Sequence, residues 1–485
     1  MEMVGDLLEE EVKELRESYR SRRTKSEVWR KSQLKGLLSL LNDKEEEIFK
    51  ALFQDLGKHQ VEAYRDEVGI LIKSVNFALQ NLKQWMTTKK VPVPNLIYPS
   101  TAEIVPEPLG LVLIFSSWNF PIGLSLEPLI GAVAAGNVVV LKPSELAPSC
   151  SALLAKLVPL YLDSKAVKVV QGGEVVAERL LEKKWDKIFF TGSPRVGRIV
   201  MTAAAKHLTP VTLELGGKCP AVVDYFENSR EKKIALKRLV SGKYSPCSGQ
   251  ACVGVDYILV DENFAPALIE LIKATTKRMF GENPKETHSS SRIINKQHFL
   301  RLKSLLDDPK VKASIVHGGS TDEDNLFIEP TILLNPPLKA HIMNEEIFGP
   351  LLPVITLKKI EDSIEFINSR PKPLALYVFT KNETLKRRMI SETSSGSLTF
   401  NDTIIQYLCD TIPFGGVGQS GFGNYHGKFS FDTFSHNKPI MRTGFLTDFW
   451  FRYPPWNDYK LGILRSAFTY NYLRFVLLLL GLKKA

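Results

Sequence analysis

Apolar positions divide the chain into regions with different periods. Through residues 1–85 they recur at helical spacing, as Leu34, Leu37 and Leu41 illustrate, and charged residues fill the other faces. From residue 109 onward, short runs of apolar residues alternate with helix-like segments. The pattern predicts an N-terminal helical region followed by two α/β regions.

The region 109–213 has the alternation typical of a doubly wound parallel sheet. Strands are predicted at Leu111–Phe115, Val138–Leu141, Val167–Val170, Lys187–Phe190 and Val211–Leu213. Helices are predicted near residues 126–135, 147–161, 175–183 and 194–206. Such sheets bind ligands at the carboxyl ends of their strands.

The region 215–420 predicts a second α/β domain. Its strands are expected at Ala221–Val223, Tyr257–Val260, Ile328–Leu333, Leu352–Thr356 and Leu374–Phe379, and its helices at residues 229–242 and Phe264–Phe280. A connector rich in proline, residues 89–108, separates the first helices from the first sheet. Proline at this density disfavours helix and predicts extended structure.

Composition narrows the class of protein. A chain of 485 residues is expected to form two or three domains, and a net charge of +10 without a basic aromatic stripe does not indicate nucleic acid. The five cysteines are odd in number and irregularly spaced, which predicts reduced thiols. The histidines show no metal-ligand spacing, so no metal site is expected. The acidic N-terminus lacks a signal-peptide pattern, and a cytoplasmic protein is expected.

One cysteine stands out by its surroundings. Cys252 ends a loop of small residues, 245–253, just before the predicted strand at Tyr257–Val260. Gly249 lets such a loop approach a ligand closely. For an isolated cysteine the commoner situation is burial as a small apolar side chain, so Cys252 is a nucleophile only if other groups join it.

Two other strand ends carry polar groups. Glu214 lies at the end of a predicted strand and before two glycines, where burial could raise its pKa toward that of a general base. Asn119 follows the strand Leu111–Phe115 and could donate to an oxyanion. The alternatives are an ordinary surface acid and an amide that completes a turn.

Two glycine motifs compete as dinucleotide sites. Residues 416–421 match G-x-G-x-x-G, but no clear strand precedes them and no helix follows, so a loop near the cleft is predicted. The segment 192–197 follows a strand and opens a helix, whose N–H groups suit a pyrophosphate. The candidate residues in it are Gly192, Ser193, Val196 and Gly197.

These stretches, in this order, resemble the aldehyde dehydrogenase superfamily. The motifs that carry the resemblance are Trp118-Asn119-Phe120-Pro121, Lys142-Pro143-Ser144-Glu145, Phe190-Thr191-Gly192-Ser193, Leu213–Lys218, Gly249-Gln250-Ala251-Cys252, Glu345–Pro350 and Pro413–Gly416. The early position of the cysteine is similar to class 3 members, and the stretches at 204–210 and 423–428 are most like those of plants.

The resemblance implies a role for each residue. Cys252 would be the nucleophile, Glu214 the base and Asn119 an oxyanion donor. Lys142 and Glu145 would contact the adenosine ribose, Glu346 would hold the nicotinamide ribose, and Phe348 would pack beside the nicotinamide. The cofactor would be NAD or NADP. The reaction would convert an aldehyde into a carboxylic acid through a thiohemiacetal and a thioester on the cysteine.

The resemblance also implies the domain plan. Residues 1–88 and 109–213 would bind the cofactor, 214–420 would carry the nucleophile, and 89–108 with 426–440 would form an arm that completes a partner's sheet in a homodimer. Substrates would be medium- or long-chain aliphatic, or aromatic, aldehydes, in an apolar funnel near Tyr64, Phe120 and Tyr244. The alternatives are a CoA-acylating enzyme, against which Glu214 counts, and a non-catalytic binding protein on this scaffold.

The tail, residues 441–485, has its own pattern. The apolar core Phe475–Leu480 is far shorter than the about 20 residues that span a bilayer. Arg465, Arg474 and neighbouring aromatic residues give the segment an interfacial character. Peripheral contact with a membrane and docking on protein are both open from the sequence.

Overall fold

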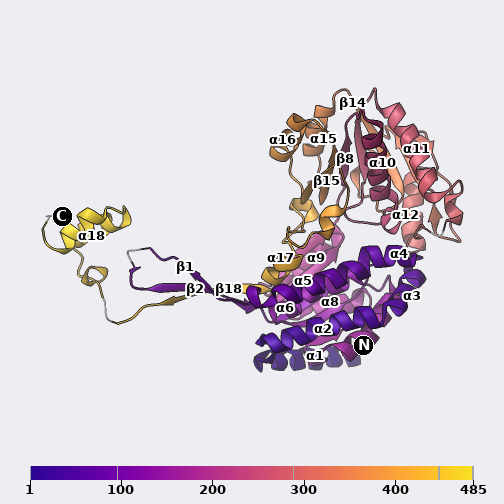
Figure 1. The fold of residues 1–485 in the computed structure, drawn as a ribbon. Helices are drawn as coiled ribbons and strands as arrows, with labels where there is room; N and C mark the ends of the chain where they lie inside the picture. The colour runs from indigo at the N-terminus through magenta and orange to yellow at the C-terminus, as the bar shows by residue number, and fades with distance from the viewer. Residues whose placement is uncertain (1, 95–96, 288, 446–447, 483–485) are drawn as a thin grey trace. The chain divides into compact units, whose positions relative to one another are not determined.

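The computed structural model describes residues 2–94, 97–287, 289–445 and 448–482, which fall into two compact units. The larger unit is drawn from residues 1–85 and 108–435, and the smaller from 86–107 and 436–485. The larger unit contains two separate sheets with helices, and the smaller has a three-stranded sheet. The predicted fold class, two α/β sheets with a small β arm, is confirmed (Figure 1).

The first sheet has the order β17-β7-β6-β3-β4-β5. Its strands are β3 (Leu111–Phe115), β4 (Val138–Lys142), β5 (Val167–Val169), β6 (Lys187–Gly192), β7 (Val211–Leu215) and the short β17 (Gly421–Phe422). All neighbouring pairs are parallel except β17 with β7. The chain runs outward from β3 to β5 and then returns to the other side of β3 with β6. The topological switch point therefore lies between β3 and β6, where ligands bind in such sheets.

Helices cover both faces of this sheet. They are α6 (Gly123–Ala135), α7 (Pro148–Tyr161), α8 (Glu174–Glu182) and α9 (Pro194–Ala205). Buried residues of α1, α8 and α9 form one apolar cluster with the strands, in which Trp185, Leu113 and Phe190 take part. The helix α6 contacts β3 and β4 and is buried along its whole length. The five strands predicted in this region are all present.

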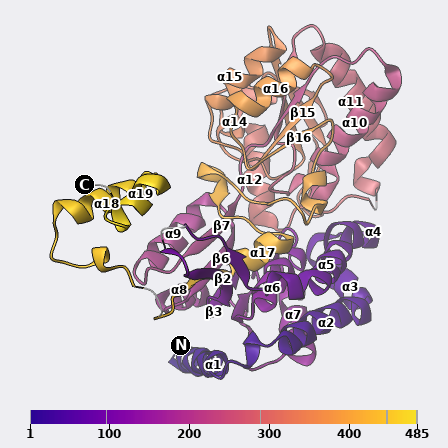
Figure 2. The same ribbon diagram turned by 60° about the vertical axis from the view of Figure 1, so that its left-hand side comes forward.

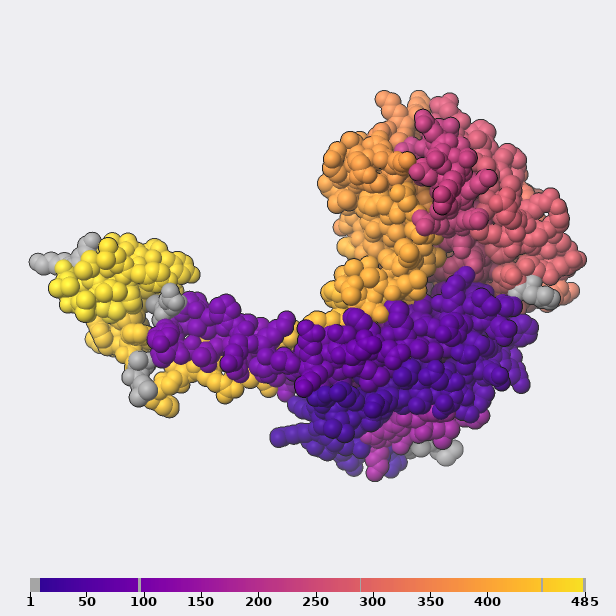
Figure 3. Space-filling view, in the orientation of Figure 1, coloured from indigo at the N-terminus to yellow at the C-terminus, as the bar shows by residue number. Residues whose placement is uncertain are grey.

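Most of the N-terminal helices form a layer on α6 and α7, whereas α1 packs on the first sheet at β3 and β4. The N-terminal helices are α1 (Glu2–Arg20), α2 (Glu27–Asp43), α3 (Glu45–Leu56), α4 (Gln60–Ala63), the π-helix η2 (Tyr64–Val68) and α5 (Gly69–Trp85). Of these, α2 and α5 pack on each other and on α6, and α3 packs on α7. The layer is the indigo surface of the larger unit in Figure 3. The π-turn at η2 is of interest because such turns are frequent at functional sites.

The second sheet has the order β10-β13-β14-β9-β8-β15-β16. Its strands are β8 (Pro220–Val223), β9 (Tyr257–Asp261), β10 (Ile315–His317), β13 (Thr331–Leu334), β14 (Leu351–Leu357), β15 (Ala375–Phe379) and β16 (Ser397–Phe400). The helices are α10 (Ser229–Tyr244), α11 (Ala265–Phe280), α12 (Lys296–Asp307), α15 (Ser363–Asn368) and α16 (Glu383–Glu392). Figures 1 and 2 show α10 and α11 on one face and α15 and α16 on the other. The strand β16 and the helices α12 and α16 had no prediction from the sequence.

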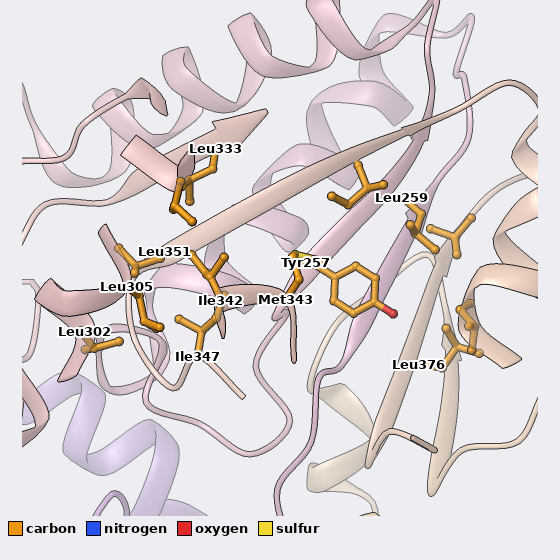
Figure 4. Packing of buried hydrophobic residues seen from close by; sticks show 14 of the residues in the cluster. Tyr257, Leu259, Leu302, Leu305, Leu333, Ile342, Met343, Ile347, Leu351 and Leu376 are labelled. Atoms are coloured by element: carbon orange, nitrogen blue, oxygen red, sulfur yellow. The ribbon is translucent and has the colours of Figure 1, made fainter. Parts of the chain in front are cut away.

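One apolar cluster holds the second sheet together. Tyr257 and Leu259 of β9 pack with Leu302 and Leu305 of α12 and with Ile342 (Figure 4). Residues of α15 and α16 extend the same cluster. The rigid sheet positions the loops that lead into and out of its strands.

The smaller unit contains the predicted arm and the tail. Its sheet, β1-β2-β18, is built from β1 (Lys89–Val91), β2 (Thr101–Pro108) and β18 (Ser435–Arg442). The family resemblance implies that Leu96-Ile97-Tyr98 is an edge-pairing element of the arm; Leu96 lies outside the described residues, and Ile97 and Tyr98 lie in a turn and not in a strand. The segment 427–433, which the sequence assigned to the arm, forms the helix α17 (Gly427–Thr433) on α5 and α6.

Two helices end the chain, α18 (Asp458–Phe468) and α19 (Tyr472–Leu479). They pack on each other around Phe451, Ile463 and Leu478. Among the described residues, no helix combines the length and the apolar character needed to cross a membrane.

Candidate active site

Cys252 and Glu214 lie on the wall of one cavity of about 320 Å³ in the larger unit. Phe120, Thr191 and Tyr425 line the same cavity. The two chemical groups come from different sheets, because Glu214 belongs to β7 and Cys252 follows α10 and precedes β9. The tertiary fold thus brings together residues that the sequence singled out separately.

Glu214 is held by the strands on either side of it. It pairs in register with Thr191 of β6 and with Gly421 of β17. Gly421 has φ +118°, and a Cβ there would lie 1.9 Å from the carbonyl oxygen of Leu213, so only glycine lets β17 approach β7. The third glycine of the rejected G-x-G-x-x-G motif therefore supports the catalytic strand, and no helix follows it, as predicted.

The carboxyl group of Glu214 is buried and has no partner. The residue is 3% exposed, and neither carboxyl oxygen has a hydrogen-bond partner among the described residues. Burial raises the pKa of Glu214 well above its ordinary value. An unpaired buried carboxyl with a raised pKa is typical of a group that exchanges a proton with a bound molecule.

The Cys252 thiol occupies a turn fixed by its main chain. The Cys252 carbonyl accepts from the Cys219 thiol at 3.3 Å, and the Val253 carbonyl accepts from the Tyr377 hydroxyl at 2.6 Å. Burial raises the pKa of Cys252 to about 12, and the carboxylates of Glu346 and Glu214 act in the same direction. The thiol is therefore protonated at neutral pH and needs a base to become a nucleophile.

Asn119 links the first sheet to the nucleophile loop. The residue is 2% exposed, and its Nδ2 donates to the carbonyl oxygen of Gln250 at 3.0 Å. Gln250 in turn donates to the carbonyl oxygens of Cys247 and Arg292. Asn119 itself does not line the cavity, and the second hydrogen of its amide is the one available to an oxyanion.

The cofactor candidates lie at the carboxyl ends of β4 and β6. Lys142 pairs with the Glu145 carboxylate just after β4. After β6, Ser193 caps α9 by accepting from the Val196 N–H at 3.4 Å. A cation, a carboxylate and the N-terminus of α9, at the ends of the two strands that flank β3, fit the ribose and pyrophosphate of a dinucleotide.

Gly197 sets the distance between α9 and the sheet. A Cβ at Gly197 would lie 3.0 Å from the Leu215 side chain, tighter than ordinary contact. The last glycine of a dinucleotide-binding turn has this packing role. Gly192 is the last residue of β6, which extends two residues beyond the predicted strand Lys187–Phe190, and α9 begins just after it at Pro194.

Glu346 and Phe348 lie on a strained loop before β14. Burial raises the pKa of Glu346 to about 8, and the negative charge of Asp256 adds to this shift. Phe348 has φ +53°, which is rare for a bulky side chain. Its ring packs edge-on against the ring of Trp118, with 5.3 Å between the ring centres. Strain of this kind persists only where the surroundings hold it, commonly at ligand sites.

The funnel predicted around three aromatic residues is only partly correct. Phe120 lines the cavity, but Tyr64 and Tyr244 do not. Tyr64 is 47% exposed, whereas the Tyr244 hydroxyl is buried and donates to the Thr331 carbonyl at 3.2 Å. The side chain of Tyr244 therefore belongs to the core, and that of Tyr64 belongs to the surface.

The remaining walls come from segments that sequence reasoning missed. Apolar side chains of the cavity include Ile70, Leu124, Ile404, Ile405, Tyr407, Leu408 and Phe414. The segment 402–408 has no periodic pattern and contains only the short turn η7 (Ile405–Leu408). The segment is rich in apolar residues but follows neither a helical nor a strand period, so the sequence gives no local signal that it faces a cavity. Among the described residues, no group of histidine, cysteine and acidic side chains could hold a metal ion.

A half-buried thiol and a buried carboxyl that line one cavity beside a dinucleotide-type sheet fit an enzyme of covalent carbonyl chemistry. The profile of the aldehyde dehydrogenase family matches residues 7–440. Aldehyde dehydrogenase family 3 member F1 of Arabidopsis thaliana is 57% identical over all of both chains, and family 3 member H1 of the same plant is 50% identical over 97% of each. A solved structure, the substrate-bound state of Staphylococcus aureus AldH, is 40% identical, with a TM-score of 0.89 over 96% of this chain and 99% of that chain. The chain belongs to the aldehyde dehydrogenase family and is an oxidoreductase of that class.

Proposed function

We propose that this protein oxidises medium- or long-chain aliphatic, or aromatic, aldehydes to carboxylic acids with NAD or NADP. The observation that carries the proposal is the shared cavity. Cys252 and Glu214 both line it, and most of its other lining residues are apolar. Apolar walls favour substrates with an extended hydrocarbon part. The plant relatives at 50–57% identity support aldehyde oxidation.

The site favours at most one negative charge at a time. Burial raises the pKa of both Cys252 and Glu214, which disfavours ionising the two groups together. In the state in which Glu214 is ionised and Cys252 is a thiol, Glu214 takes the thiol proton as Cys252 attacks the aldehyde carbon, and a thiohemiacetal forms. Its oxyanion accepts from the free hydrogen of the Asn119 amide and from the Cys252 main-chain N–H, which places donors where charge develops.

The second step releases the acid. When bound, a nicotinamide cofactor would supply the hydride acceptor that turns the thiohemiacetal into a thioester on Cys252. Lys142, Glu145 and the start of α9 would hold the cofactor's ribose and phosphates, while Glu346 and Phe348 would lie beside its nicotinamide end. Glu214 first releases to solvent the proton that it took from the thiol. It then takes a proton from a water molecule that attacks the thioester, and it passes this proton to the leaving sulfur, which restores the thiol.

A panel of aldehydes assayed with NAD and with NADP tests the function and fixes the cofactor preference. We expect kcat/KM to rise with hydrocarbon chain length, because each buried methylene contributes about 0.8 kcal/mol of binding. Short aldehydes serve as the matched control. The absence of turnover with every aldehyde would contradict the proposal. Formation of an acyl-CoA product on addition of CoA would show that a thiol, and not water, accepts the acyl group.

We also propose a homodimer in the cytoplasm that touches a membrane surface. The strands β1 and β18 are the edges of the arm sheet, and such edges offer unpaired main-chain groups to a second copy.

The tail carries exposed apolar side chains beside exposed cations, which suits a position at a membrane surface. The apolar residues are Trp456, Phe468, Leu473 and Leu480, and the cations are Arg465 and Arg474. All five cysteines are free thiols, in keeping with a reducing compartment.

Sedimentation with and without vesicles of anionic phospholipid tests the arm and the tail together. The full chain is expected to sediment as a dimer and to pellet with vesicles, and Phe468→Glu with Leu473→Glu should reduce pelleting by about tenfold or more, since charge opposes insertion of apolar residues. Leu208→Glu is the matched control, because Leu208 is 90% exposed in the larger unit. A monomeric mass would contradict the arm proposal. Equal pelleting of both variants would contradict the membrane proposal.

A further inference from the structure

A fully buried ion pair connects the N-terminal helical layer to the Asn119 loop. The side chains of Lys58 and Glu67 are both 0% exposed, and Lys58 Nζ lies 2.5 Å from Glu67 Oε1. Lys58 lies between α3 and α4, and Glu67 lies in the π-helix η2. A pair of charges this deep needs strong compensation from its neighbours, so its remaining contacts are informative.

Lys58 makes two further contacts, both with the Asn119 loop. Its Nζ donates to the carbonyl oxygen of Asn119 at 2.8 Å and lies 4.1 Å from the centre of the Phe120 ring. The ammonium thus fixes the main chain of Asn119 and the side chain of a cavity residue. A substitution of Lys58 would leave both without their partner.

Glu67 holds the other end of the same loop. Its Oε2 accepts from the N–H groups of Ile122 and Gly123, each at 2.9 Å. These groups open α6, which has no side-chain cap of its own. A carboxylate at a helix start satisfies unpaired N–H groups and suits the positive end of the helix dipole. Glu67 therefore caps α6 from another helix.

The same layer also reaches the nucleophile loop. Glu62, one turn before Glu67, accepts from the Cys247 N–H at 2.7 Å and from the Ser291 hydroxyl at 2.9 Å. Both loops of the site are thus tied to residues 58–67. The Asn119 amide lies between them because it donates to Gln250.

We propose that Lys58 and Glu67 are positioning residues that hold residues 119–123 so that the Asn119 amide meets the substrate oxyanion. The inference rests on the proposed function, since it gives Asn119 that role. Replacing a buried ion pair by apolar groups is often neutral for stability, so packing alone does not require these charges. Together the two charges make four contacts with residues 119–123, three with main-chain groups and one with the Phe120 ring. These contacts fix the orientation of the loop.

A double-mutant cycle between Lys58 and Asn119 tests the proposal. We expect Lys58→Met to lower kcat per cofactor-binding site by about 10- to 100-fold, a large part of the loss typical for one oxyanion donor, and to leave the KM of the cofactor within about twofold. In the Asn119→Ala background the same substitution should have almost no effect on kcat, because its target is already absent.

Two further variants keep the test decisive. Lys58→Met with Glu67→Gln removes both charges but keeps a side-chain oxygen that can accept from the N–H groups at the start of α6, so it is expected to fold even if the single variant does not, with the same loss of kcat. Arg30→Met is the matched control, since Arg30 is a cation 3% exposed that donates to the Ala134 carbonyl at 3.1 Å in the same layer, and it should change thermal stability only.

The possible results separate the two levels of inference. If Lys58→Met costs the same factor in both backgrounds, or lowers only the melting temperature, the positioning role is overturned while the proposed function stands. If Asn119→Ala leaves kcat unchanged, the oxyanion role of Asn119 fails, and the positioning role fails with it.

Discussion

Replacing Cys252 with alanine is expected to lower kcat for aldehyde oxidation by about 10⁴-fold or more, as loss of a covalent nucleophile does in other enzymes. No other described cysteine lines the cavity, so the chain offers no substitute thiol there. The measurement is reduced-cofactor formation over time with excess aldehyde. Binding of the cofactor should persist, because the residues at the ends of β4 and β6 are unchanged.

Cys409→Ala is the control for this substitution. Cys409 is partly exposed, pairs with the Thr411 hydroxyl at 3.2 Å and does not line the cavity. Its removal should leave kcat within about twofold, in the range of an ordinary surface substitution. Steady turnover by Cys252→Ala above about one hundredth of the wild-type rate would rule out a covalent route through this sulfur.

Replacing Glu214 with glutamine is expected to slow release of the acid by about 10²- to 10⁴-fold, the usual contribution of a general base. Acylation should survive in part, because the substitution leaves the thiol and the oxyanion donors in place. Rapid mixing should then show a burst of reduced cofactor with slow turnover after it. Mass spectrometry should find the acyl group on the peptide that contains Cys252.

The pH dependence gives a second measure of the same group. A base must be ionised, and burial raises the pKa of Glu214, so wild-type acid release should increase as pH rises through that raised pKa. Glu214→Gln should lose this dependence. Glu127→Gln is the matched control, because Glu127 is 2% exposed and burial raises its pKa to about 7, yet it does not line the cavity.

If Glu127→Gln gave the same slow release as Glu214→Gln, the loss could not be assigned to the carboxyl in the cavity. If Glu214→Gln showed neither burst nor acyl group, Glu214 would be required to form the thioester, and its role in hydrolysis would have no support. The two carboxyls are similar in burial, so the comparison isolates their position relative to Cys252.

Much of the fold could be predicted from local pattern. The run Leu111–Phe115 is apolar at every position because a central parallel strand is covered on both faces, and it forms β3 with the same bounds. Pro194 and Ser193 signalled the start of α9 for a similarly local reason, namely cap chemistry. By contrast β16, with intermediate burial throughout, has a weaker pattern and was missed.

The candidate site divides along the same line. Cys252 ends a loop of small residues, Glu214 lies at a strand end just before two glycines, and Asn119 is a polar residue that follows a predicted strand, so sequence context alone singled them out. Tyr244 and Tyr64 were predicted as funnel residues because they are aromatic. The direction of a side chain decides whether it reaches the cavity, and neither of these two lines it. Which way a side chain points depends on the packing of its whole helix.

The amino-acid sequence by itself determined the strands, the helix starts and the chemical groups, because each depends on neighbours within a few positions. Only the tertiary structure decided that β17 flanks Glu214, that the segment 402–408 walls the cavity, and that Lys58 and Glu67 hold the Asn119 loop. Lys58 and Asn119 are 61 positions apart, and their hydrogen bond exists only because the N-terminal helices pack on α6. Contacts of that range depend on the packing of entire layers, which no local pattern of residues encodes.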